Sequence, residues 1–248
     1  VRETLELARQ HGVQNLSVDL MYGLPTQTMD DYLDSIRAAA DLGVQHISAY
    51  GLKVEAGTRL QTMLETGDLT LPDEDATADM MEQGIVLLES AGYPRYEISN
   101  FAKPGFASPH NLVYWRQQYY LGLGLNAAGM LPVKGAMYQR RTNAASMKEY
   151  QRMLSQGRLP VAQTVLIDKD EAMFETVMLG LRMADGIGYE EFAAMHGRKL
   201  DDVYGAAIAE LEKQRLLRPA DTANPRLRLN DRGLALQNTA LMLFMKDR

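Results

Sequence analysis

The chain has 248 residues, of which 46% are hydrophobic and 23% charged, as in ordinary folded proteins of one or two domains. No apolar run approaches the ~18 residues that a transmembrane helix needs. A net charge of −6 leaves no basic excess to neutralise phosphates, which disfavours a nucleic-acid-binding role. Cysteine is absent, so disulfides and thiolate metal sites within the chain are excluded, and a reducing cytoplasmic setting is expected.

Helical and strand-like patterns alternate in the first part of the chain. Val1 already lies inside an amphipathic helical pattern, so we expect the chain to be part of a longer protein. Thr28 and Asp31 resemble a capping box, and Pro72 suits the first turn of a later helix. This alternation is typical of βα units with a parallel sheet. The expected elements are, in chain order, a helix over 1–11, a strand over 16–21, a helix over 28–43, a strand over 46–52 and a helix over 72–92.

The second part of the chain changes character twice. Residues 93–145 are rich in Gly, Pro, Asn and aromatic residues, with short extended pieces at 95–99 and 137–141, so we expect loops that carry function. From about residue 165 helical repeats return, and two apolar pairs flank a polar turn over 220–225. Three helices with a two-stranded wing indicate a winged-helix-like domain.

Two residues in the first part are candidates for binding a nucleoside. Asp19 is expected near the carboxyl end of a parallel strand, where barrel enzymes place their chemistry. A carboxylate there can accept hydrogen bonds from a ribose diol, or it can serve only to fix the loop at Gly23. Gly51, just after Tyr50, lacks a Cβ and leaves room for a base to approach the backbone, although a glycine at a strand end can also be a simple bend.

The segment from Ser108 to Trp115, Ser-Pro-His-Asn-Leu-Val-Tyr-Trp, is unusually dense in functional side chains. It contains the only tryptophan of the chain and one of its four histidines. In a polar loop, His110 could ligate a haem iron while Tyr114 and Trp115 cover the porphyrin faces. The alternative is structural: the aromatic residues pack the loop onto the sheet, and His110 binds backbone carbonyls.

Other polar residues give weaker signals. Arg140, Arg141 and Asn143 could hold a carboxylate in bidentate fashion, although exposed arginines are commonly only solvated. The remaining histidines are interpreted as structural: His11, His46 and His196.

Several motifs together resemble a known family. Asp19–Thr28 (Asp-Leu-Met-Tyr-Gly-Leu-Pro-Thr-Gln-Thr) and His46–Tyr50 resemble the oxygen-independent coproporphyrinogen oxidase-like radical S-adenosylmethionine (SAM) proteins. The His-Asn-x-x-Tyr-Trp element of residues 110–115 is similar to the one that marks the haem-chaperone, HemW-like branch of these proteins. One departure is Asn126, where the Gly-rich run of the family leads us to expect a small residue.

The resemblance implies an α/β fold in two domains. Residues 1–164 would form the carboxyl-terminal portion of a partial (β/α)6 radical-SAM barrel, with the last two barrel strands in 16–52 and a haem-loop region after them. Residues 165–248 would form a HemN C-terminal-like, winged-helix-like α+β domain. The family's Cys-x-x-x-Cys-x-x-Cys loop, which binds a 4Fe-4S cluster, would lie upstream, so we expect this chain alone to be inactive in SAM cleavage.

The resemblance also assigns residues to ligands. It implies that Asp19 and Gly51 contact SAM. For haem, it implies a contact set of His110, Asn111, Tyr114 and Trp115, with His110 as a candidate ligand of the haem iron.

The function implied is that of a cytoplasmic haem chaperone, which binds haem and transfers it to haem-dependent respiratory proteins. Association with a membrane would then be peripheral, through those recipients. One alternative is an enzyme, a dehydrogenase that oxidatively decarboxylates coproporphyrinogen III. Another is a nucleic-acid or protein-binding module in the winged-helix-like tail, where Arg226 and Arg228 make only a thin basic patch. The sequence therefore leaves open whether the protein is an enzyme.

Overall fold

The structure is a computed structural model that describes residues 1–219, 221 and 223–245. The polar turn expected over 220–225 lies partly outside the described residues. The chain divides into two compact units, Val1–Ser108 and Pro109–Arg248, each of which is described by itself. The domain boundary expected between residues 164 and 165 falls inside the second unit and stays a prediction.

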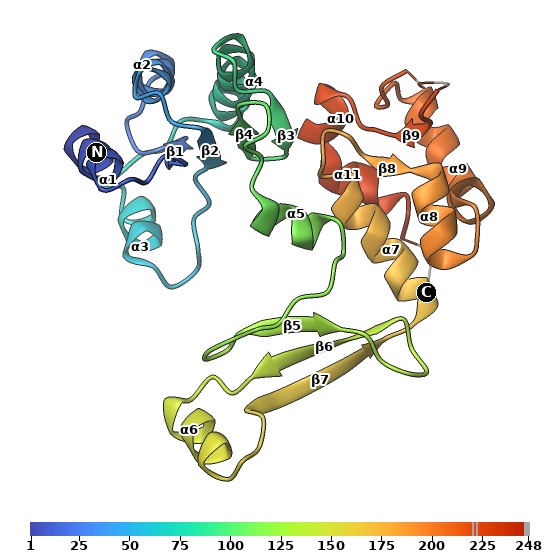
Figure 1. Cartoon of the computed structure of the whole chain (residues 1–248). Helices are drawn as coiled ribbons and strands as arrows, with labels where there is room; N and C mark the ends of the chain where they lie inside the picture. Colours follow the sequence, from blue (N-terminus) through green and yellow to red (C-terminus); the bar gives the residue numbers. More distant parts are fainter. Residues whose placement is uncertain (220, 222, 246–248) are drawn as a thin grey trace. The chain divides into compact units, whose positions relative to one another are not determined.

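The first unit is built on a four-stranded sheet with the strand order β1-β2-β4-β3. The expected parallel pairing of the first two strands and the helix between them are confirmed, because β1 and β2 run parallel and α2 connects them. Strand β4 is antiparallel to both of its neighbours. The strands are β1 (Ser17–Tyr22), β2 (His46–Gly51), β3 (Arg95–Glu97) and β4 (Asn100–Ala102), and the helices are α1 (Arg2–Gln10), α2 (Met29–Asp41), α3 (Arg59–Glu65) and α4 (Glu74–Ser90) (Figure 1).

The helix starts follow from their caps. Thr28 and Asp31 form the expected capping box at the start of α2. The start of α4 differs from the expectation, because Asp73 is its N-cap and Pro72 precedes the helix. The Asp73 carboxylate accepts a hydrogen bond from the backbone N–H of Ala76, and this cap fixes the first turn.

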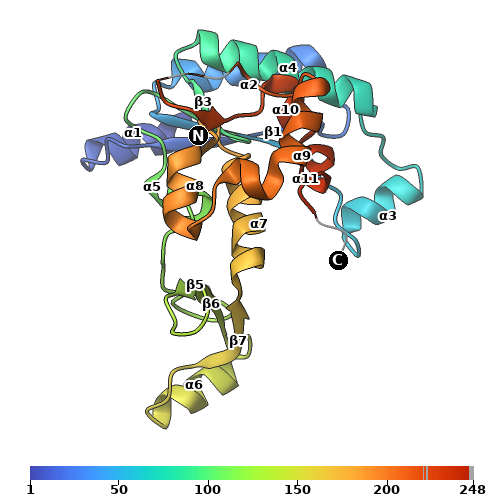
Figure 2. The same ribbon diagram turned by 90° about the vertical axis from the view of Figure 1, so that its right-hand side faces the viewer.

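Helices α2 and α4 cover one face of the sheet (Figures 1 and 2). This face is apolar, and the core includes Ile36, Ile47 and Phe101. The two helices approach closely at Gly84 of α4, where a Cβ would lie 2.6 Å from the ring of Tyr32 on α2. Because side chains alternate along a strand, every second residue of these strands points away from this core, to the other face of the sheet.

The second unit begins with α5 (Pro109–Trp115) and a three-stranded antiparallel sheet. Its strands are β5 (Ala128–Leu131), β6 (Tyr138–Asn143) and β7 (Val161–Ile167), with α6 (Met147–Ser155) between the last two (Figure 1). Only a small core supports this sheet, made by Met130, Tyr138, Ile167 and Ala172. Most of β7 is exposed.

The rest of the second unit has the expected winged-helix-like arrangement. Its larger core is formed by the helices and the wing together. β8 pairs with β9 in antiparallel fashion, and a further antiparallel bridge joins Leu217 to Leu229. The elements are α7 (Lys169–Gly180), β8 (Ile187–Gly188), α8 (Tyr189–His196), α9 (Leu200–Lys213), β9 (Arg226–Leu227), α10 (Asp231–Ala235) and α11 (Gln237–Met242). In the part of the chain that the structure describes, no helix is long and apolar enough to cross a bilayer.

Candidate functional site

The face of the first sheet opposite to α2 and α4 is polar, and Asp19 lies on it. In the strand register Asp19 is opposite Ser48, and Ser48 is opposite Asn100, so the three side chains form a row across the sheet. Asp19 is exposed. It is the third of the six residues of β1, in the middle of the strand and not near its carboxyl end as the sequence suggested. An exposed carboxylate on a polar sheet face can accept hydrogen bonds from the hydroxyls of a ligand.

His46 lies on the same polar face and is buried, as are Ser48 and Asn100. Its Nδ1 lies 2.8 Å from the Ser17 hydroxyl and its Nε2 lies 2.9 Å from the Tyr96 hydroxyl. Burial lowers the pKa of His46, and the carboxylate of Asp19 partly offsets this effect. The structural role expected for His46 is therefore confirmed, and its ring links β1 to the segment that carries β3.

Gly51 ends β2 and lies opposite Tyr22 in the strand register. A Cβ at this position would lie 3.1 Å from the Tyr22 ring, closer than ordinary van der Waals contact. The missing side chain therefore makes room for Tyr22, whose ring also packs against Tyr32 at 5.4 Å. The structure thus gives Gly51 a packing role, while its contact with SAM stays a prediction.

The segment that carries His110 is a helix and not the loop expected from sequence. Pro109 is the first residue of α5, where its missing N–H costs no hydrogen bond. The helical spacing puts His110 and Tyr114 on one side, one turn apart, with ring centroids 4.9 Å apart in an edge-to-face arrangement. Both side chains are exposed. Asn111 is half-buried and interacts with other residues.

The aromatic row continues beyond the helix. The Tyr114 ring meets the Tyr120 ring edge to face at 4.6 Å, so His110, Tyr114 and Tyr120 form one continuous surface of rings. Tyr120 is bridged to Met130 of β5, which anchors the row to the sheet of the second unit. An exposed imidazole at the end of an aromatic surface suits a flat, metal-containing ligand.

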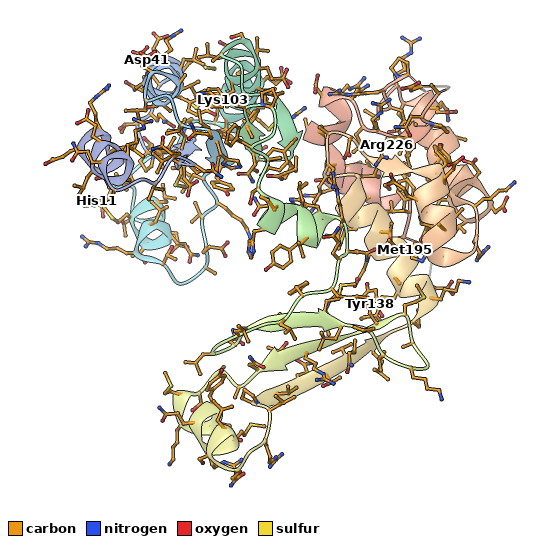
Figure 3. All side chains as sticks on the ribbon, viewed as in Figure 1. His11, Asp41, Lys103, Tyr138, Met195 and Arg226 are labelled. Carbon is orange, nitrogen blue, oxygen red and sulfur yellow. The ribbon has the colours of Figure 1, made fainter. Side chains whose placement is uncertain are left out.

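Trp115 faces a different part of the second unit. The Arg182 guanidinium lies over its ring at 5.5 Å from the centroid. Trp115 also lines a cavity of about 370 Å³ together with residues of α7, α8 and β9, among them Met195 and Arg226, which are labelled in Figure 3. Its contact with haem, predicted together with that of Tyr114, stays a prediction, and its geometry here is that of a packing residue.

Sequence reasoning missed a buried carboxylate, Glu175 of α7, which is only 6% exposed. The Tyr138 hydroxyl donates to one of its oxygens and the Arg140 guanidinium donates to the other. The Gln117 amide donates to the Tyr138 hydroxyl at 3.2 Å, and the Thr176 hydroxyl donates to Gln117. The carboxylate therefore joins β6, α7 and the segment after α5 (Tyr138 is labelled in Figure 3).

The three residues proposed to hold a carboxylate have different surroundings. Arg140 is paired with Glu175, yet its side chain is 42% exposed. Arg141 points to the opposite face of β6, where its Nε donates to the Gln139 amide oxygen at 3.2 Å. The Asn143 amide donates to the carbonyls of Gly122 and Gly124, so it fixes the glycine-rich segment. Of the three, Arg140 is the one paired with Met130, the residue to which Tyr120 is bridged.

The same segment explains the departure at Asn126. This residue has φ +53°, in the left-handed region where glycine is favoured and asparagine is the best tolerated of the other residues. Asn126 therefore adopts the left-handed backbone conformation at the position where we expected a small residue.

The wing offers little to a nucleic acid. The Arg226 guanidinium donates to Glu191 at 2.7 and 3.2 Å and to the carbonyls of Asp185 and Gly186, so its charge is compensated within the protein. Arg228 is half-buried. The basic patch suggested by the sequence is therefore weaker in the folded protein.

The chain supplies no thiolate for an iron–sulfur cluster, because it contains no cysteine. Among the described residues there is also no group of three or more His, Asp or Glu side chains that could hold a metal ion. The residues present therefore do not fit a resident cluster, whereas a single exposed imidazole at His110 fits one axial position of a haem.

Comparisons with known proteins agree with this description. Residues 167–236 match the HemN C-terminal domain family. "Heme chaperone HemW" of Bacillus subtilis (strain 168) is 34% identical over 244 residues, which are 98% of this chain and 62% of that protein. "Heme chaperone HemW" of Lactococcus lactis subsp. lactis (strain IL1403) is 32% identical over 247 residues, 100% of this chain and 62% of that protein. Coproporphyrinogen III oxidase (HemN) from Escherichia coli, a radical SAM enzyme, matches in structure with a TM-score of 0.73 and 18% identity, over 98% of this chain and 57% of that one.

The structural match defines the class: the chain has the α/β fold found in a radical SAM enzyme, as the sequence motifs predicted. The sequence matches to proteins named heme chaperone HemW confirm the resemblance of this chain to HemW-like proteins. The chain spans about 62% of the length of these relatives. The likeness to HemN at 18% identity concerns the fold alone and does not favour the coproporphyrinogen dehydrogenase alternative.

Proposed function

We propose that the protein is a haem chaperone, which binds haem and transfers it to haem-dependent proteins of respiration. The observation that supports this proposal is the row of rings formed by His110, Tyr114 and Tyr120. Aromatic surfaces bind the apolar faces of a porphyrin, and a neutral imidazole donates a ring nitrogen to iron. The HemW relatives carry the name of haem chaperones.

His110 is the proposed ligand of the haem iron, and Tyr114 shapes the contact surface beside it. The two residues share one side of α5 at a spacing of four, so a porphyrin that reaches the iron position also covers Tyr114. Asn111 and Trp115 belong to the proposed contact set as well, although they lie on other sides of the helix.

We expect the His110→Ala variant to bind haem at least about tenfold more weakly than the wild-type chain and to lose the Soret shift, since it lacks the imidazole. Titration with haem, followed by absorbance, measures both quantities. The matched control is His11→Ala, since His11 is also exposed but ends α1 in the first unit. An unchanged Soret band and affinity in His110→Ala would contradict the proposed ligand.

SAM is the second proposed ligand, and it belongs to the longer protein. Asp19 would accept hydrogen bonds from the ribose hydroxyls, since its carboxylate is exposed on the polar sheet face. Gly51 would lie near the adenine. When bound beside a 4Fe-4S cluster, whose cysteines this chain does not contain, SAM supplies radical chemistry. Location in the cytoplasm, and contact with membranes only through the recipients of haem, complete the proposal.

A further inference from the structure

The residue Arg140 occupies a particular place on the sheet of the second unit. Tyr120 is bridged to Met130, Met130 is paired with Arg140, and Arg140 is paired with Val165. Directly paired residues of antiparallel strands point to the same face. These four side chains therefore form a single row across one face of the sheet, and the first of them belongs to the aromatic surface that begins at His110.

The row carries both apolar and polar side chains, as the binding of an amphipathic ligand requires. Met130 is buried and Val165 is exposed, and both residues that pair with Arg140 on the neighbouring strands are apolar. Tyr120 and Arg140 are two strands apart, about 10 Å between backbones, a span that their side chains bridge. The charge of Arg140 acts on Tyr120: burial and Tyr114 raise the pKa of Tyr120, and Arg140 partly opposes them. The Tyr120 hydroxyl therefore stays protonated and can donate a hydrogen bond.

Glu175 binds the guanidinium of Arg140 through one nitrogen and leaves its other N–H donors available. One nitrogen, Nη2, donates to Glu175, whose other oxygen is taken by Tyr138. An arginine has five N–H donors in a rigid fork. Glu175 is its only ion-pair partner within the described residues, and the Arg140 side chain is 42% exposed. A second carboxylate can therefore approach the remaining donors from solvent.

We propose that Arg140 binds a carboxylate of the porphyrin, and that Glu175 positions its guanidinium for this contact. Arg140 and the Tyr120 hydroxyl would hold the acidic edge of the macrocycle, while His110 and Tyr114 contact its centre and face. This inference rests on the proposed haem binding and adds to it the chemical class of the second contact, a propionate-type carboxylate.

The experiment compares two ligands on the same chain. Haem carries free propionates, and haem dimethyl ester carries the same ring and iron without the negative charges. A charge-assisted hydrogen bond supports about a tenfold difference in affinity. We therefore expect the wild-type chain to bind haem about tenfold more tightly than the ester in the same micellar buffer, and Arg140→Gln to bind both ligands with the weaker affinity.

Arg141→Gln is the matched control, because Arg141 is the next residue of the same strand and points to the other face. It should retain the tenfold preference for haem. A wild-type chain that binds haem and the ester equally would overturn the role of Arg140 and leave haem binding intact. Binding of neither ligand would overturn both proposals. The wild-type comparison needs no variant, so it stays decisive even where Arg140→Gln folds poorly.

Discussion

Replacement of Glu175 by alanine is expected to lower the free energy of unfolding of the second unit by about 3 kcal/mol. The carboxylate is 6% exposed and accepts hydrogen bonds from both Tyr138 and Arg140. Its removal leaves the buried Tyr138 hydroxyl with only the Gln117 amide, and it leaves a cavity in α7. The expected loss lies at the lower end of the range for broken buried pairs, because Arg140 can turn toward solvent.

Urea denaturation followed by tryptophan fluorescence measures this loss. The chain has a single tryptophan, Trp115, and it lies in the second unit, so its emission reports the unfolding of that unit alone. Asp170→Ala is a matched control, since Asp170 is an acidic residue of the same helix that is exposed to solvent. A Glu175→Ala midpoint no lower than that of Asp170→Ala would show that the buried carboxylate does not stabilise the fold.

Glu175 also illustrates why part of the site escaped prediction. Its partners Tyr138 and Arg140 are more than 30 residues away in the sequence, and a spacing of that kind depends on how the sheet packs against α7. One signal was available. Glu175 is the one charged residue between Ala172 and Gly180 of α7, a stretch that is otherwise largely apolar, and a carboxylate there requires compensation.

The elements that were predicted well are strands and helices with one buried face, and the helix has a clear N-terminal cap. The strands Ser17–Tyr22 and His46–Gly51, and the helix after Thr28, show apolar side chains at the period of their secondary structure. The sheet of the second unit was only partly foreseen. Its strand Val161–Ile167 has residues 162–166 exposed, so no alternation of buried and exposed positions marks it in the sequence.

The candidate site was foreseen in its residue types more than in its geometry. His110 and Tyr114 do lie together, but on a seven-residue helix, because Pro109 starts a helix as readily as it interrupts one. Trp115 was expected beside them. A helix turns by about 100° per residue, so Trp115 points away from His110 and packs under Arg182.

The second unit should lose stability as the pH falls from 6.5 to 4, because His196 is buried as the neutral base. His196 is 3% exposed, its Nε2 lies 2.9 Å from the Thr176 hydroxyl, and its ring packs on Phe192. Burial lowers its pKa to about 4, and the charge of Lys169 adds to this effect.

Acid lowers the stability of the second unit because unfolding is accompanied by proton uptake at His196. Between pH 4 and 6.5 the unfolded chain binds a proton at His196 and the folded chain does not, so acid favours unfolding. The stability is fully present above pH 6.5, falls through this window by about 3 kcal/mol, and becomes constant again below the folded pKa.

His196→Gln removes the titrating group, so the free energy of unfolding of this variant should depend less steeply on pH than that of the wild type between pH 4 and 6.5. Urea denaturation at several pH values, followed by Trp115 fluorescence, measures the two slopes. His11→Gln, a change at an exposed histidine of the first unit, should leave the wild-type slope unaltered. His46 also has a lowered pKa, but it lies in the first unit, which this tryptophan does not report. Parallel curves for His196→Gln and the wild type would mean that His196 is protonated equally in the folded and unfolded chains.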